Sequence, residues 1–233
     1  MIKKIAKIIL IVTIAGMIFS CSEDKEDEET EKPVPDALTK TFVFECDSAF
    51  SFTAQLVNAT ATIILPEKTY ELKQIEAASG AKYSDGEITF WTKGEEAFLE
   101  LEDTTYRKCV NNGVAAVWEK AKLSGVDFRA SGFEPGWHLE IEDDGKTLFV
   151  TNYGNERYEF VTPKPEVNKE TGEIIYRFSK RNIELTATIK DEECTDPKGD
   201  TYNLTVYMEF EGKNLRGCGK NLRDVKNVEM QEN

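Results

Sequence analysis

The sequence predicts an all-β fold: a small eight-stranded antiparallel barrel or sandwich, followed by a second antiparallel β domain, with a short helix joining the two. Two long regions contain short segments in which apolar and polar residues alternate, the pattern of strands with one buried face. Turn residues separate these segments, and a stretch with helical spacing lies between the two regions. With 233 residues, the chain is also longer than one small domain usually is.

The N-terminal segment, residues 1–21, has the pattern of an export signal. Three lysines precede an apolar run of 12 residues that ends at Phe19, shorter than the roughly 20 residues that span a bilayer as a helix. The end of the run, Ile18-Phe19-Ser20-Cys21, resembles a bacterial lipobox, although Phe19 is bulkier than the residue usual there. The resemblance implies an acyl anchor such as palmitate on Cys21, which would hold the chain at the outer membrane of a bacterial cell envelope, on the periplasmic side or at the cell surface. The alternative is an ordinary signal peptide with a chance cysteine.

Residues 22–37 are highly charged, contain two prolines and show no apolar period. Such a segment buries too little surface to fold, so we expect a disordered tether that reaches at most about 55 Å. Its acidic start also resembles the surface-export signal of some bacterial lipoproteins, and a plain solvated spacer is the alternative.

The region 38–112 contains eight candidate strands. In the first two, Phe42, Phe44 and Cys46, and then Phe50 and Phe52, alternate with polar residues. The further candidates are 59–65, 69–76, 82–84, 87–93, 95–101 and 105–109. Turn sequences such as Ser84-Asp85-Gly86 and Lys93-Gly94 separate several of them. Eight short strands with tight turns suit a small antiparallel barrel or sandwich.

The segment 113–130 is expected to be a linker with a short helix, because Val114, Val117, Trp118 and Ala121 recur at helical spacing. The region 131–220 is expected to be the second β-rich domain. Its candidate strands lie near 137–142, 147–153, 156–162, 173–179, 183–190 and 202–210. Residues 221–233 form a polar tail that is expected to fray.

Charge and cysteine content narrow the choice of partner and compartment. With 29 Lys plus Arg against 43 Asp plus Glu, the net charge is −14, which disfavours nucleic acid and favours a cationic partner. Setting Cys21 aside, four of the five cysteines remain, an even set suited to an oxidising compartment. The domain layout selects the pairs Cys46–Cys109 and Cys194–Cys218, which should contribute roughly 4 and 3.5 kcal/mol.

An enzyme is not indicated. The one histidine, His138, lies on a predicted strand, where a structural role is more common, and no serine–histidine–aspartate grouping can be assembled around it. No spacing typical of a metal site and no glycine-rich phosphate loop occurs, so we expect neither a metal nor a cofactor.

Two motifs between two cysteines stand out. The first is Ser79-Gly80-Ala81-Lys82-Tyr83, and the second is Phe90-Trp91-Thr92-Lys93-Gly94, continued by Glu95-Glu96-Ala97. They are bracketed by Phe44-Glu45-Cys46-Asp47 and Tyr106-Arg107-Lys108-Cys109. Together they resemble the membrane-bound inhibitors of c-type lysozyme, the MliC family, over about 75 residues; Phe44 stands where that family has an aromatic residue, often tyrosine.

The resemblance implies an eight-stranded barrel that inserts a loop serine, Ser79, and a hairpin lysine, Lys93, into the cleft of a c-type lysozyme, a basic protein. Gly80 would let the loop approach closely, and Gly94 would form the tight turn that presents the lysine. Tyr83 would pack at the loop base or contact the enzyme. Without the resemblance, Ser79 is an ordinary turn serine and Lys93 an exposed hairpin lysine; Trp91 fits a barrel side chain better than a contact.

The second β region is similar to a family of uncharacterised bacterial envelope proteins. Glu134, Trp137 and Arg216 are candidates for a ligand site there, although a structural turn and a core tryptophan are the favoured explanation. The leading hypothesis is therefore an envelope lipoprotein that inhibits c-type lysozyme. Its main rival is an envelope ligand-binding or structural lipoprotein that acts through the second domain.

Overall fold

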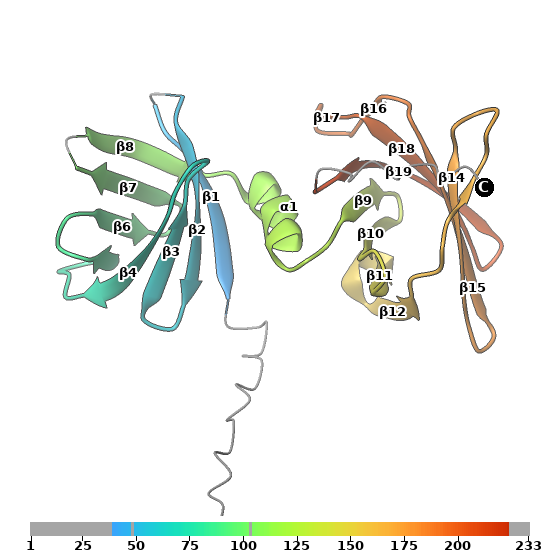
Figure 1. Cartoon of the computed structure of the whole chain (residues 1–233), viewed down its shortest axis with the longest axis horizontal. Helices are drawn as coiled ribbons and strands as arrows, with labels where there is room; N and C mark the ends of the chain where they lie inside the picture. The colour runs from blue at the N-terminus through green and yellow to red at the C-terminus, as the bar shows by residue number, and fades with distance from the viewer. Residues whose placement is uncertain (1–38, 48, 103, 224–233) are drawn as a thin grey trace, which may run out of the picture. The chain divides into compact units, whose positions relative to one another are not determined.

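A computed structural model describes residues 39–47, 49–102 and 104–223 of the chain (Figure 1). The predicted signal segment with Cys21, the tether 22–37 and residues 224–233 of the predicted tail lie outside the described residues. The described part contains one α-helix, and no helix in it is long and apolar enough to cross a membrane.

The first β region forms a closed antiparallel barrel of eight strands, as the sequence predicts. The strands are β1 (Lys40–Glu45), β2 (Ser51–Val57), β3 (Thr60–Ile64), β4 (Thr69–Ile75), β5 (Ala81–Ser84), β6 (Thr89–Lys93), β7 (Glu96–Leu101) and β8 (Thr104–Asn111). Each strand pairs with its neighbour in sequence, and β1 closes the barrel against β8, where Phe44 faces Asn111.

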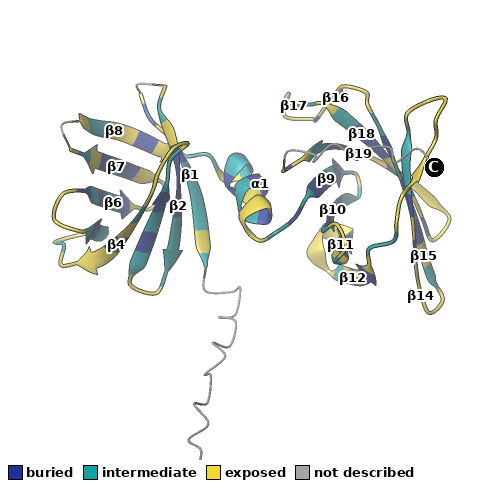
Figure 2. Ribbon diagram, viewed as in Figure 1, coloured by how far each residue is buried: buried dark blue, intermediate teal, exposed yellow. Residues whose placement is uncertain are grey.

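The interior of the barrel is filled with side chains. Alternation along the strands directs one row of residues inward, which Figure 2 shows as alternating buried and exposed bands. The large inward residues include Phe44, Phe52, Ile63, Leu72, Tyr83, Phe90 and Leu99. A disulfide joins Cys46 to Cys109, the pair expected from the layout. Because side chains fill the interior of this closed barrel, its loops and its outer wall are the surfaces that it offers to a partner.

Helix α1 (Gly113–Leu123) follows the barrel where the helical spacing predicts it. The side chain of Asn112 caps its first turn by accepting a hydrogen bond from the Ala115 amide at 3.0 Å. The buried face of the helix carries Trp118, whose ring centroid lies 5.2 Å from that of Tyr202 in the second β region. Leu222, which the sequence assigns to the fraying tail, is buried in the same cluster.

The second β region is a nine-stranded antiparallel sheet in the order β12-β11-β10-β9-β19-β18-β15-β14-β13. Its strands are β9 (Phe128–Phe133), β10 (Gly136–Ile141), β11 (Lys146–Thr151), β12 (Glu156–Val161), β13 (Glu166–Val167), β14 (Ile174–Lys180), β15 (Ile183–Lys190), β18 (Leu204–Phe210) and β19 (Lys213–Asn221). A short 3-10 helix, η2 (Asn152–Gly154), precedes β12, and a separate hairpin pairs β16 (Cys194–Thr195) with β17 (Thr201–Tyr202).

The sheet curves so that its two arms share one core. Phe160 on β12 and Phe178 on β14 have ring centroids 5.5 Å apart, although six strands separate them in the sheet order. The core lies on the concave face. The second predicted disulfide, Cys194–Cys218, ties the β16–β17 hairpin to β19.

Candidate functional site

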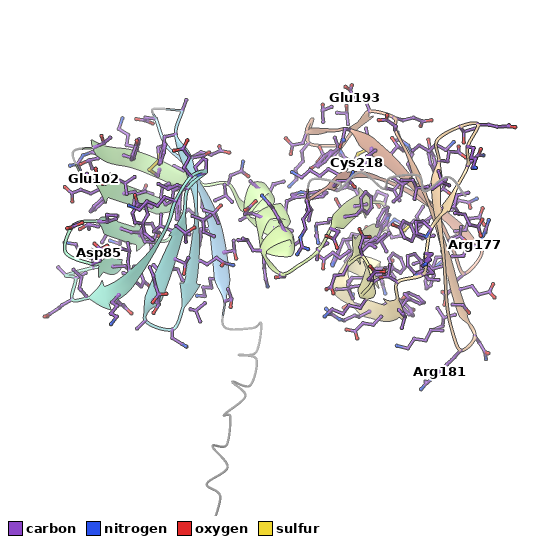
Figure 3. The ribbon with its side chains drawn as sticks, viewed as in Figure 1. Asp85, Glu102, Arg177, Arg181, Glu193 and Cys218 are labelled. Carbon is purple, nitrogen blue, oxygen red and sulfur yellow. A yellow bond between two sulfur atoms is a disulfide. The ribbon has the colours of Figure 1, made fainter. Side chains whose placement is uncertain are left out.

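The two predicted contact residues leave the barrel at the same end. Ser79 lies in the loop between β4 and β5, and Lys93 is the last residue of β6, before the turn to β7. Antiparallel pairing of β5 with β6, in which Ala81 faces Thr92, places the end of the loop beside Lys93. The turns at the opposite end carry Asp85 and Glu102 (Figure 3).

Gly80 is the point at which the loop touches β6. Its φ of +71° lies in the left-handed region that favours glycine. A Cβ atom at this position would lie 2.5 Å from the Thr92 carbonyl oxygen and 3.1 Å from the Cβ of Lys93. The backbone of the serine loop therefore packs against the strand that carries the lysine, and only glycine permits that distance.

Trp91 provides a second tie between the loop and β6. Its indole Nε1 donates a hydrogen bond to the carbonyl oxygen of Ser79 at 2.9 Å. The neighbours Phe90 and Thr92 are buried, so the Trp91 ring lies on the outer wall, where it stacks on Phe98 at 5.7 Å. Trp91 is thus a barrel side chain, as expected, but one that contacts the candidate site from outside the core.

Hydrogen bonds within the β6–β7 hairpin and from β8 fix the hairpin in place. The Thr92 hydroxyl donates to the Glu96 carbonyl oxygen at 3.1 Å, across the turn that contains Gly94. Asn111 of β8 donates its side-chain amide to a Glu95 carboxylate oxygen at 2.8 Å and its backbone amide to the Glu95 carbonyl oxygen at 2.9 Å. Gly94 has a φ of +63°, which a tight turn requires. The hairpin is therefore preorganised in the free protein.

Ser79 and Lys93 are both exposed. Among the residues that the structure describes, neither the Ser79 hydroxyl nor the Lys93 ammonium has a hydrogen-bond or ion-pair partner. Two unpaired donors side by side at one end of a rigid barrel are suited to carboxylate groups on a second molecule.

Tyr83 is buried, whereas the other four residues predicted to bind lysozyme (Ser79, Gly80, Lys93 and Gly94) are exposed. Its side chain is only 4% exposed, and its ring packs in the barrel core with a centroid 5.9 Å from that of Phe90. Burial also raises the pKa of its phenol. Of the two roles expected for Tyr83, packing at the base of the loop fits this buried position. Direct contact with a partner does not fit it, because almost none of the side chain is exposed.

Comparison with known proteins connects this geometry to a family. A family profile described as membrane-bound lysozyme-inhibitor of c-type lysozyme matches residues 44–108. Three curated relatives carry the name membrane-bound lysozyme inhibitor of C-type lysozyme. The protein from Yersinia enterocolitica is 50% identical over 42 residues, which cover 18% of this chain and 36% of the relative.

The other two relatives align over more of their length. The protein from Pseudomonas aeruginosa is 29% identical over 103 residues, 39% of this chain and 81% of the relative. The protein from Escherichia coli is 33% identical over 99 residues, 42% of this chain and 84% of the relative. The chain belongs to the MliC family. No solved structure matches it.

The MliC family profile matches residues 44–108, which end before α1, so it gives no information on the second β region. Of the residues singled out there, Trp137 is buried in the core. Glu134 is exposed and accepts a hydrogen bond from the Tyr153 hydroxyl at 3.2 Å. Arg216 lies over the ring of Tyr207, 6.0 Å from its centroid. The structure does not bring these three side chains together around a cavity.

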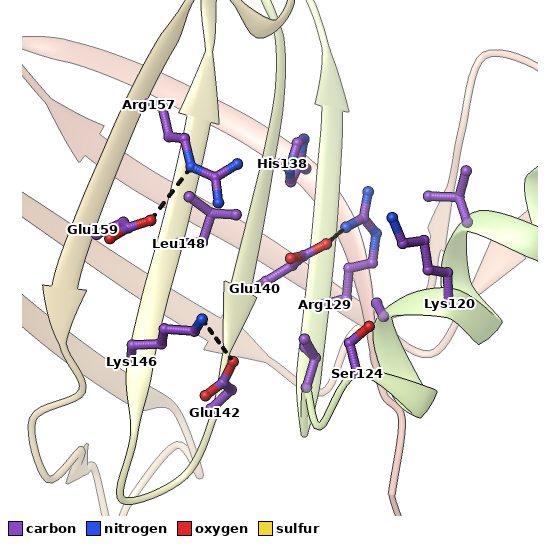
Figure 4. A pocket seen from close by; sticks show the side chains of 13 residues that line it. Lys120, Ser124, Arg129, His138, Glu140, Glu142, Lys146, Leu148, Arg157 and Glu159 are labelled. Atoms are coloured by element: carbon purple, nitrogen blue, oxygen red, sulfur yellow. Dashed lines mark hydrogen bonds and ion pairs between the residues drawn. The ribbon is translucent and has the colours of Figure 1, made fainter. Parts of the chain in front are cut away.

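A groove that the sequence does not reveal lies between α1 and the outer face of β9 to β12 (Figure 4). Its volume is about 600 Å³. Cationic side chains from four elements line it: Lys120, Arg129, Lys146 and Arg157. Three carboxylates face them in the ion pairs Arg129–Glu140, Lys146–Glu142 and Arg157–Glu159, the last two at 3.9 and 3.4 Å.

Arg129 and His138 are the unusual members of this groove. The Arg129 side chain is 8% exposed and lies over the Trp118 ring at 5.5 Å, and burial lowers its pKa to about 10. Burial, together with the nearby Arg129 and Arg157, lowers the pKa of His138 to about 4, so its imidazole is neutral at physiological pH. Arg129 thus helps to dock α1 on the sheet, and His138 lies part-buried on β10, where it lines the same groove. In the described residues no group of His, Cys, Asp and Glu side chains is placed to hold a metal ion.

Proposed function

We propose that the barrel, residues 38–112, inhibits c-type lysozyme by occupying its catalytic cleft, with Ser79 and Lys93 as the contacts that enter it. The single observation that carries this proposal is the juxtaposition of these two exposed, unpaired donors at one end of the barrel. Membership of the MliC family, whose curated relatives are named as lysozyme inhibitors, supports the choice of partner.

The chemistry of the target explains why a serine and a lysine suit it. Lysozyme works with two carboxyl groups, a protonated glutamic acid and an ionised aspartate. The Ser79 hydroxyl is able to bond either group, whereas the Lys93 ammonium pairs best with the ionised one. Occupying both would exclude the sugar chain and remove the protonation pattern that hydrolysis requires. The protein itself needs no catalytic group for this function.

The remaining features are consistent with a protein of the cell envelope. We propose that Cys21 is lipidated and that residues 22–37 tether the barrel to the outer membrane; the curated relatives are named membrane-bound. The net charge of −14 would steer a basic lysozyme toward the barrel.

The test is a dose–response of the soluble chain without its first 21 residues against c-type lysozyme acting on cell walls. Lys93→Ala should weaken inhibition roughly 30-fold or more, because truncating one partner of a desolvated charge pair typically costs about 2–5 kcal/mol. Ser79→Ala should cause a smaller loss. Lys73→Ala removes an equal charge from an exposed position on β4 and should inhibit like the wild type.

Two results would contradict the proposal. If the folded wild-type chain does not inhibit, lysozyme is not its target. If it inhibits but both Lys93→Ala and Ser79→Ala match it, the barrel acts through another surface.

A second candidate function is ligand binding in the envelope by the second β region. The groove of about 600 Å³ beside α1 favours it, since its size is that of small-molecule sites. A folded chain that fails to inhibit any c-type lysozyme would leave this candidate as the better account.

A further inference from the structure

Trp91 stands out because it joins the two halves of the candidate site. It lies two residues before Lys93 on β6, and its indole reaches the backbone of Ser79, twelve residues earlier in the chain. A tryptophan N–H that bonds a loop carbonyl at 2.9 Å fixes the direction of that peptide. The direction of the Ser79 peptide in turn limits where the Ser79 hydroxyl can point.

The ring of Trp91 is itself held in place. It stacks on Phe98 with an interplanar angle of 18°. Phe98 in turn lies under the Arg107 guanidinium, 6.0 Å from the ring centroid. The indole is therefore part of a row of side chains across β6, β7 and β8 on the outer wall, and this row orients its N–H toward the loop.

Gly80 and Trp91 act on the loop from two sides. The backbone of Gly80 packs against the Thr92 carbonyl, and the Cβ that glycine lacks would also lie 3.1 Å from the Trp91 Nε1 atom. The close approach of Gly80 thus leaves the indole within reach of the adjacent Ser79 carbonyl. The loop has little other support, because Glu76, Ala78 and Ser79 are exposed.

We propose that Trp91 is a positioning residue for lysozyme binding, which acts by holding the Ser79 loop in its binding conformation next to Lys93. This inference rests on the proposed function of the barrel. Its contribution is preorganisation: a loop that is already ordered loses less conformational freedom when it enters the cleft. Trp91 need not touch the partner to have this effect.

The informative variant is Trp91→Phe, which keeps one aromatic ring opposite Phe98 and removes the indole N–H together with the second ring. It should raise the inhibition constant about two- to tenfold, the range that corresponds to a net hydrogen bond of about 0.5–1.5 kcal/mol. Phe98→Leu leaves the N–H in place and removes the ring that orients it, so it should also weaken inhibition, by less than Trp91→Phe. Melting temperatures are measured for both variants.

A double-mutant cycle shows whether Trp91 acts through Ser79. In a Ser79→Ala background, Trp91→Phe should cost less than twofold, because the hydroxyl that it positions is gone. In a Lys93→Ala background it should still cost its full factor. Equal cost in both backgrounds would overturn the positioning role.

A measurement on the free protein separates this inference from the proposed function. Backbone ¹⁵N relaxation should show larger motion at residues 77–80 in Trp91→Phe than in the wild type, with the β6–β7 hairpin unchanged. Unchanged relaxation overturns the inference, whatever the inhibition data show. If the wild type does not inhibit lysozyme, the proposed function fails, while the relaxation data still decide whether Trp91 orders the loop.

Discussion

Replacing Gly80 with alanine should uncouple the serine loop from the barrel. An alanine at this position introduces both backbone strain and a steric clash. At a φ of +71° an L-residue is strained by about 1–2 kcal/mol. The new Cβ would also lie 2.5 Å from the Thr92 carbonyl oxygen, a backbone atom that cannot rotate away. The loop must therefore move outward by roughly half an ångström or more, since contacts of this kind essentially never fall below 3.0 Å.

Such a shift is enough to disturb the Ser79 contact, because hydrogen-bond lengths span only about half an ångström. A hydrogen bond to a charged group contributes about 1.5–3 kcal/mol, so Gly80→Ala should weaken inhibition about tenfold to a hundredfold. The free energy of unfolding of the Gly80→Ala variant, measured by urea denaturation, should be about 1–2 kcal/mol lower than that of the wild type.

Gly86→Ala isolates the effect of backbone strain. Its φ of +103° is also one that L-residues rarely adopt, but a Cβ there meets no atom within 4 Å, and its turn lies at the opposite end of the barrel. This variant should therefore lose stability without moving the serine loop. If Gly80→Ala inhibits like the wild type, or loses no more inhibition than Gly86→Ala, the close packing of the loop on β6 is irrelevant to binding and the reasoning fails.

Four further outcomes are expected. His138 has a pKa near 4 in the folded chain and about 6.5 when unfolded, so the unfolded chain binds more protons between these values. Stability should therefore fall as the pH drops from 6.5 to 4, and urea denaturation of His138→Gln should show a smaller fall. Replacing both Cys46 and Cys109 with alanine should destabilise the barrel by about 2–5 kcal/mol in denaturant, and an unchanged midpoint would contradict this. Association with lysozyme should slow as salt rises from 0.1 to 1 M, because the screening length shortens from about 10 to 3 Å; a stopped-flow rate indifferent to salt would show that charge plays no part. Cys21→Ser should abolish acyl labelling and membrane association, and unchanged fractionation would refute the anchor.

The barrel was predictable because its signals are local. Alternating residues and tight turns define all eight strands, and each strand pairs with its neighbour in sequence. The second β region was predicted less completely, because no strand was predicted at β9, β13, β16 or β19. Strands β13 and β16 are only two residues long. Strands β9 and β19 contain glycines, which obscure the pattern of a strand.

The structure explains these glycines by tertiary contacts. A Cβ on Gly132 would lie 2.2 Å from the Trp137 indole nitrogen, and one on Gly217 would lie 2.6 Å from the same ring. The sheet therefore places glycines where the ring of Trp137 approaches the backbone. Gly132 pairs with Trp137 across the β9–β10 hairpin, whereas Gly217 meets the same ring from a strand that is distant in sequence. No local pattern reports the second contact.

In the candidate site, too, some residues were predictable from the sequence and others depend on tertiary contacts. Family motifs identify Ser79 and Lys93, and strand pairing explains why they meet. The bond from Trp91 to Ser79 and the burial of Tyr83 depend on which way each side chain turns relative to the barrel wall. In the second region, Arg129 breaks strand alternation by lying between buried Phe128 and Ala130 while itself buried. A buried arginine of this kind becomes recognisable only once α1 and Trp118 are seen to cover it.

Competition with a cleft-binding oligosaccharide tests the central claim most directly. The affinity of the soluble chain for c-type lysozyme would be measured with increasing chitotriose, which occupies the same catalytic cleft. The account predicts that the apparent dissociation constant rises in proportion to the sugar concentration, and that Lys93→Ala binds at least roughly 30-fold more weakly without sugar. An affinity that is unchanged by saturating sugar would show that the chain binds outside the cleft, and would contradict the proposed mechanism.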